Sequence, residues 1–271
     1  MIAVELRKQM RRLRTYIGLG ICFGLPIIIT IALKVGGPPH GRGDNNPEEA
    51  FFRLATKSGV NMPIAALSVM SMFLLPIVIM LFFGESVSGE ANWGTLRYLL
   101  VRPVKRGRLL RAKILVASLL AIIGTALVIA GGLAAGVAAF GWHSVITPSF
   151  AVFSPGLALE RLLVAAGYII WGFSGAAALA FWLSTATDSP VGTVAGSMGF
   201  IIVSQILDGI TAVPAGFRNW LPTHFWRAWD ALFTIPSHLN DMVRGTLHQL
   251  PYAVGFLVLA WWWFKRKDVL S

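Results

Sequence analysis

Six stretches of this 271-residue chain lack Asp, Glu, Lys and Arg, and each is at least 19 residues long. A helix needs about 20 mostly apolar residues to cross the roughly 30 Å hydrocarbon core of a bilayer. Charged residues make up 13% of the chain, whereas soluble domains carry about 25%. The pattern therefore excludes a soluble enzyme and a disordered chain, and it predicts a polytopic membrane protein. The stretches are 15–33, 58–84, 114–159, 162–187, 189–207 and 245–264.

We predict an all-α fold with six transmembrane helices in a single transmembrane domain over residues 1–271. The longest stretch could hold two spans, but its part from 141 to 156 contains the turn residues and polar side chains of a loop. We therefore place one span there. The predicted spans are 15–36, 61–84, 113–140, 158–183, 190–212 and 246–264.

Prolines and paired glycines within the spans predict kinks and close packing. Pro26 and Pro76 interrupt the first two spans and are expected to kink them. Glycines four residues apart let neighbouring helices approach closely in lipid. Such pairs occur in the third span at Gly132 and Gly136, and in the fifth at Gly192 and Gly196.

The basic residues are distributed unevenly between the two sides of this topology. The side that carries both termini has 15 Lys and Arg against 5 acidic residues, and the other side has 8 against 7. Because cytoplasmic loops are enriched in Lys and Arg, we expect cytoplasmic N- and C-termini and a plasma (inner) membrane location. The net charge of +11 is thus explained by topology, and we expect no nucleic acid partner.

Residues 1–14 are predicted to form a basic amphipathic helix at the membrane surface. Apolar side chains recur every three or four residues, at Ile2, Leu6, Met10 and Leu13. The other faces carry the cations Arg7, Lys8, Arg11 and Arg12. We expect this helix to lie in the plane of the inner leaflet, with its cations facing membrane lipids.

Residues 85–112 form the longest predicted cytoplasmic loop. Early acids and later bases favour a helix from about 86 to 101, which Pro103 would end. Its apolar stripe is either a docking surface for a partner or a face that lies flat on the membrane. The stripe consists of Trp93, Leu96, Leu99 and Leu100.

The same loop carries a family resemblance. Its residues follow the order Glu90-x-x-x-Gly94-Thr95-Leu96-x-x-Leu99-Leu100-x-x-Pro103-x-x-Arg106-x-x-Leu109-Leu110-x-x-Lys113. This order resembles the signature after the second span of the membrane (permease) subunits of type-2 ABC exporters. The beginning Glu5-Leu6-Arg7-Lys8 and the ending Phe264-Lys265-Arg266-Lys267-Asp268-Val269 are also similar to that family.

The resemblance implies a permease subunit that exports an amphipathic or hydrophobic substrate, such as a drug, peptide antibiotic or lipid-like molecule. It implies two copies of an ATP-binding subunit, which hold ATP and Mg, and a second permease copy or a homologous permease. This chain has no phosphate-binding G-x-x-x-x-G-K-[ST] loop, so we expect it to hold no cofactor and to be no enzyme itself. The helix at 86–101 would be the coupling helix, and residues 1–14 the elbow helix.

The segment 213–245 is too polar to span, and we expect one or two short interfacial or re-entrant helices there. The resemblance implies an outer gate in this segment, and the candidate residues are Trp220, Phe225, Trp226 and Trp229. The main alternative is an ion-coupled secondary carrier or channel without an ATPase. Gln205 and Asp208 near the end of the fifth span are its candidate polar pathway.

A remote alternative is an intramembrane serine protease. Gly172-Phe173-Ser174-Gly175 matches the nucleophile motif G-x-S-G of rhomboid-like proteases. The serine would need a histidine within hydrogen-bond reach. We expect Ser174 to lie deep in its span, too far from His248 at the outer start of the sixth span. The histidines show no tight metal-ligand spacing, so neither a catalytic nor a metal site is predicted.

Overall fold

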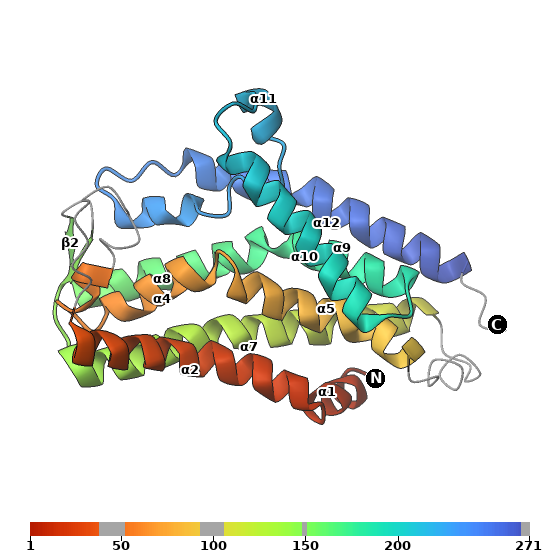
Figure 1. The fold of residues 1–271 in the computed structure, drawn as a ribbon, viewed down its shortest axis with the longest axis horizontal. Helices are drawn as coiled ribbons and strands as arrows, with labels where there is room; N and C mark the ends of the chain where they lie inside the picture. The colour runs from red at the N-terminus through yellow and green to blue at the C-terminus, as the bar shows by residue number, and fades with distance from the viewer. Residues whose placement is uncertain (38–51, 93–105, 148–150, 267–271) are drawn as a thin grey trace.

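A computed structural model describes residues 1–37, 52–92, 106–147 and 151–266. These residues form an elongated bundle of helices (Figure 1). Within the described ranges, five helical segments are long and apolar enough to cross a membrane. The prediction of a mostly helical, multi-pass membrane protein is therefore confirmed. The segments are Leu13–Gly36, Leu74–Asn92, Arg106–Phe140, Pro155–Ala186 and Pro190–Gly209.

The first, third and fifth predicted spans correspond to single helices: α2 (Leu13–Gly36), α7 (Arg106–Phe140) and α10 (Pro190–Gly209). The longest apolar stretch, 114–159, contains most of α7, and α8 begins near the end of that stretch. After α7 the chain forms two short antiparallel strands, β1 (Val145–Ile146) and β2 (Val152–Phe153), which the all-α prediction did not include.

The sixth predicted span lies within α12 (Asn240–Arg266), which is not among the five apolar segments. His248 and Gln249 near its start and three tryptophans near its end make α12 less apolar than the others. The total of six spans therefore stays a prediction.

The second predicted span is divided into α4 (Asn61–Met70) and α5 (Leu74–Asn92). Pro76 explains the break, because proline lacks an N–H and its ring clashes with the carbonyl four residues earlier. That carbonyl belongs to Met72, and it instead accepts a 2.9 Å hydrogen bond from Nε2 of Gln205. The expected effect of Pro76 is thus confirmed, whereas Pro26 lies inside the continuous helix α2.

The fourth predicted span consists of α8 (Pro155–Gly172) and α9 (Ser174–Ala186), which are separated only by Phe173. The following segment, 210–239, joins α10 to α12. It contains the short helix α11 (Ala215–Arg218) and the 3-10 helix η1 (Ala228–Phe233), and their interfacial or re-entrant placement stays a prediction. We call residues 210–239 the cap segment.

Glycines allow α7 to pack closely on its neighbours. A Cβ atom on Gly136 would lie 2.3 Å from the carbonyl oxygen of Gly59, and one on Gly132 would lie 2.8 Å from Cα of Pro63. The predicted packing role of this pair is confirmed. A Cβ on Gly196 would meet its nearest neighbour, Leu183, at an ordinary 3.5 Å, so the second glycine pair marks no such close approach.

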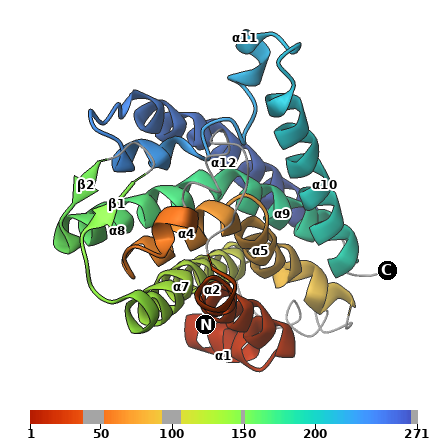
Figure 2. The same ribbon diagram turned by 60° about the vertical axis from the view of Figure 1, so that its left-hand side comes forward.

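The bundle has two distinct ends along its long axis. The helix α1 (Ile2–Met10) and the last turns of α12 lie at one end, which we call the termini end (Figure 1). The strands β1 and β2 and the start of α8 lie at the opposite end (Figures 1 and 2). This arrangement is the one that an even number of spans requires.

Candidate functional site

A buried cluster of charged side chains lies at the termini end. The ammonium of Lys113 has no exposed surface and lies 2.9 Å from Oε1 of Glu5 and 2.8 Å from Oε2 of Glu90. It also donates a 2.7 Å hydrogen bond to the carbonyl of Ser86. Lys8 completes the group at 3.1 Å from Oε1 of Glu90. We call Glu5, Lys8, Glu90 and Lys113 the ion cluster.

The ion cluster is electrically balanced and joins three helices. It contains two carboxylates and two ammonium groups, and an ammonium has three N–H donors. In Lys113 these donors face two carboxylates and one carbonyl, which compensates for the cost of burying the charge. Glu5 and Lys8 come from α1, Glu90 from the end of α5, and Lys113 from α7. The arrangement fixes the position of α1 against both other helices.

A second ion pair strengthens the same region. Arg14, at the start of α2, pairs with Glu85 on α5. Gly89 leaves room for this contact, since a Cβ there would lie 3.2 Å from Nη2 of Arg14 and 3.3 Å from Nη1 of Arg12. On the other side of α5, Oγ of Ser184 accepts backbone hydrogen bonds from residues 87 and 88 at 3.0 and 2.9 Å. The end of α5 is therefore held from two sides.

The N-terminal helix is shorter than predicted and is oriented by polar contacts. α1 ends at Met10, and a turn at residues 11 and 12 separates it from α2. Its buried residues are Glu5 and Gln9, whereas Ile2 and Leu13 of the predicted apolar stripe are 49% and 75% exposed. The other two members, Leu6 and Met10, pack partly buried against the hydrophobic core, so the stripe faces the bundle only in part.

The predicted coupling loop at 85–112 contains fewer residues in the structure. Residues 85–92 continue α5 without a break, and α7 already begins at Arg106. A separate helix starting at 86 is therefore wrong, because ion pairs at Glu85 and Glu90 stabilise the charged end of α5. Trp93, Gly94, Thr95, Leu96, Leu99, Leu100 and Pro103 lie outside the described residues.

The other predicted cations occupy different environments. Arg7 and Arg11 are exposed, and Arg12 is half-buried beside Gly89. Arg106 donates hydrogen bonds of 3.2 and 3.0 Å to the carbonyls of Phe264 and Lys265, so it caps the last turn of α12. Of the two coupling residues that the structure describes, Glu90 belongs to the ion cluster and Arg106 does not.

Of the four aromatic residues proposed for an outer gate, Trp220 and Phe225 both contact the ring of His248, and the Trp220 ring centroid lies 6.4 Å from it. Trp220 is 69% exposed, whereas Trp226 and Trp229 are buried. Trp226 packs edge-on against Phe173 at 4.6 Å between ring centroids. Phe225 contacts the ring of His248 at 5.4 Å. The aromatic residues thus anchor different parts of the cap segment.

Side chains of α8 and α12 hold the cap segment through its backbone. Tyr168 donates a 2.7 Å hydrogen bond to the carbonyl of Phe225, and Gln249 donates one of 2.7 Å to that of Pro222. Tyr252 bonds in the same way to the carbonyl of Trp220, and Arg161 to that of Leu232. These contacts make the cap segment an integral part of the fold.

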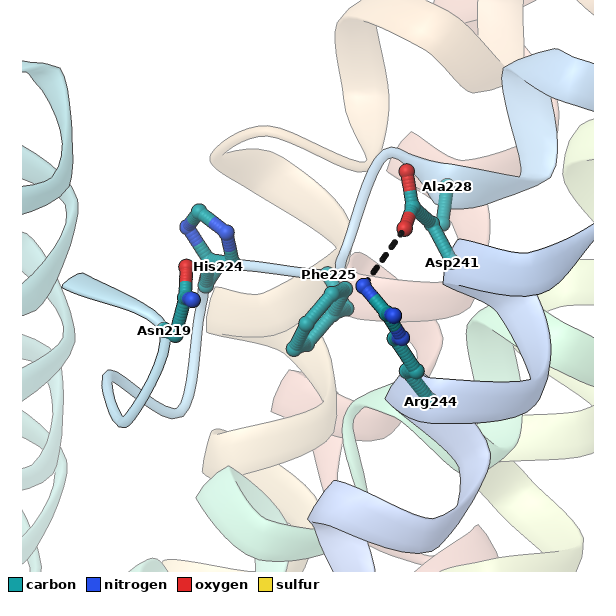
Figure 3. A pocket seen from close by; sticks show the side chains of 6 residues that line it. All are labelled: Asn219, His224, Phe225, Ala228, Asp241 and Arg244. Carbon is teal, nitrogen blue, oxygen red and sulfur yellow. Dashed lines mark ion pairs between the residues drawn. The ribbon is translucent and has the colours of Figure 1, made fainter. Parts of the chain in front are cut away.

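A pocket of about 310 Å³ lies between the cap segment and the start of α12 (Figure 3). Asp241 and Arg244 on its wall are 4.0 Å apart. Nearby, Asp208 pairs with Nδ1 of His224 at 2.5 Å. Gln205 and Asp208 of the proposed polar pathway therefore have separate partners, in Met72 and His224. The pocket is lined by Asn219, His224, Phe225, Ala228, Asp241 and Arg244.

Along the long axis of the bundle, Ser174 and His248 lie closer to the same level than predicted. A Cβ on Gly175 would lie 2.7 Å from Oε1 of Gln249, the residue after His248. Ser174 is not deeper than His248 because α12 starts further along the bundle than α8. Trp171, near the end of α8, donates a hydrogen bond to the carbonyl of Thr246, near the start of α12. In the described residues, however, Oγ of Ser174 has no hydrogen-bond partner.

These observations define a multi-pass helical membrane protein with a buried ion cluster at one end. Residues 51–270 match the family described as a protein of unknown function, DUF2705, and the chain belongs to that family. No curated protein matches the chain.

The predictions missed Lys113 as the centre of the ion cluster and Glu5 as its partner. Both residues were visible only as members of basic or family-like stretches. One signal was available: Lys113 directly precedes a long charge-free stretch, where an unpaired cation would be costly. Hydropathy alone does not identify the carboxylates that neutralise it.

Proposed function

We propose that this chain is the permease subunit of an ATP-driven type-2 ABC exporter. The observation that carries the proposal is the ion cluster, because it fixes α1, the end of α5 and the start of α7 to one another. Of these, α5 and α7 flank residues 93–105, which hold the middle of the family signature. A force applied at this segment by a separate ATPase would be passed to three helices at once.

The mechanism is rigid-body alternation of helices around a substrate path. ATP and Mg bind to two copies of the partner ATPase, whose closure moves residues 93–105 of each permease copy. A second copy of this chain or a homologous permease completes the path. The termini face the cytoplasmic side of the plasma membrane. An amphipathic or hydrophobic substrate is moved outward. The cap segment, held to α8 and α12, forms the outer end of the path.

Co-purification tests the proposal directly. The full chain is expressed with a tag in its native host, solubilised in mild detergent, and isolated through that tag. We expect the ATPase to co-purify and substrate transport in proteoliposomes to require ATP. If no ATPase co-purifies and transport proceeds without ATP, the proposal is refuted and the ion-coupled carrier is favoured.

A pair of neighbouring variants tests the role of the ion cluster in coupling. Lys8→Gln removes a cation that pairs with Glu90, whereas Arg7→Gln removes an exposed cation of the same helix. We expect Lys8→Gln to lower transport per ATP hydrolysed by several-fold at unchanged expression. Arg7→Gln should match the unaltered protein. Equal coupling in both variants would show that the ion cluster transmits no force.

A further inference from the structure

The start of α7 and the end of α12 meet at the surface of the termini end. Arg106 is hydrogen-bonded to the last carbonyls of α12, as described above. Gly107 permits the contact, because a Cβ there would lie 2.3 Å from a ring carbon of Trp261. Four cations surround this junction, and we call them the basic seam: Arg108, Arg111, Lys265 and Arg266.

The basic seam is exposed, and among the described residues it has no acidic partner. All four side chains belong to exposed residues, and in the described part of the chain none of them forms an ion pair with Asp or Glu. Glu5, Glu85 and Glu90 at the same end are already engaged with other cations. The seam therefore presents four positive charges that fit an anionic partner.

Tryptophans place these charges at the depth of lipid headgroups. The Trp261 ring centroid lies 6.0 Å from the guanidinium carbon of Arg111 and 5.4 Å from Nζ of Lys265. The guanidinium of Arg266 lies 4.0 Å from the ring centroid of Trp262. Tryptophan is enriched at the membrane–water interface, where its ring sits at headgroup level.

An apolar stripe continues from the cations along α7. Exposed residues follow Arg108 and Arg111 every three or four positions on the same helical face. They change from basic to apolar along the helix, which matches the order of an anionic headgroup followed by apolar acyl chains in a phospholipid. The apolar members are Leu115, Leu119 and Ile122.

We propose that the basic seam binds the headgroup of an anionic phospholipid. Arg108 and Arg111 hold the phosphate through paired N–H donors, a geometry that guanidinium groups provide. Lys265 and Arg266 contribute further positive charge, and the acyl chains lie along the stripe of α7. The lipid would join α7 to α12 where these helices meet, and this role does not depend on the transport proposal.

Native mass spectrometry of the delipidated full chain in detergent tests the site. The probes are phosphatidylglycerol and phosphatidylcholine with identical acyl chains. We expect the protein to bind phosphatidylglycerol preferentially. Arg108→Gln together with Arg111→Gln should weaken that binding about 25-fold, at about fivefold for each cation near an anionic surface. Arg108→Lys with Arg111→Lys should retain most of it.

The matched control, Lys57→Gln with Arg244→Gln, removes two exposed cations outside the basic seam. Because the attraction between a cation and a headgroup falls off within a Debye length, this control should change binding less than about twofold. Added inorganic phosphate should leave lipid binding unchanged. Circular dichroism confirms that each variant is folded. Equal binding of the two lipids, equal loss in the control, unaltered binding by the double Gln variant, or displacement by inorganic phosphate would each overturn the proposal.

Discussion

At the scale of single residues, Lys113 is the position where one substitution should cost most stability. Replacing it by Met leaves Glu5 without its closest cation and removes the cation that lies 2.8 Å from Oε2 of Glu90. Removing one partner of a buried ion pair costs about 3–5 kcal/mol, since the remaining charge is buried and uncompensated. We expect Lys113→Met to lower the free energy of unfolding by that amount, measured by denaturant unfolding in detergent micelles.

The control for Lys113 is Arg111→Met, two residues away on the exposed face of α7. Exposed cations contribute about 0–1 kcal/mol, so its free energy of unfolding should stay within that range. A second comparison adds Glu5→Gln and Glu90→Gln to Lys113→Met, which removes the uncompensated charges and should recover part of the loss. If Lys113→Met is as stable as the unaltered protein, the ion cluster does not hold the helices together.

At the scale of secondary-structure elements, the break between α4 and α5 depends on a pair of residues. Gln205→Leu removes the donor to the Met72 carbonyl and should cost about 0.5–1.5 kcal/mol, the net contribution of one hydrogen bond. Pro76→Ala supplies an N–H that can bond to this carbonyl within a continuous helix. In the Pro76→Ala background, Gln205→Leu should therefore cost much less. Thermal unfolding of the four proteins gives the coupling energy, and purely additive effects would contradict this explanation.

Elements were predictable from the sequence where one physical rule dominates. Long apolar stretches must be helical in lipid because every backbone group needs a partner within the segment. The positions of α2, α7 and α10 follow from that rule. The bounds of α1 and α5 do not, because they depend on ion pairs between residues more than 70 positions apart, such as Glu5 with Lys113. Likewise, proline predicted the break at Pro76, but only the packed bundle identifies Gln205 as the residue that satisfies it.

At the scale of the whole molecule, both ends of the described chain lie at the termini end (Figure 1). The cap segment carries exposed Phe217 and joins α10 to α12 on the opposite half of the predicted topology. Cysteine labelling tests this arrangement with little background, because the single cysteine, Cys22, is fully buried. The three sites to compare are Arg7→Cys, Arg266→Cys and Phe217→Cys.

A membrane-impermeant maleimide added to intact cells should label Phe217→Cys and neither of the other two variants. In inverted membrane vesicles the result should reverse, since positive-inside topology places Arg7 and Arg266 in the cytoplasm. The unaltered protein, with Cys22 alone, is the control and should stay unlabelled from both sides. Labelling of Arg7→Cys and Arg266→Cys from opposite sides would require an odd number of spans. α12 would then not cross the membrane, and its lower hydropathy would be the physical reason.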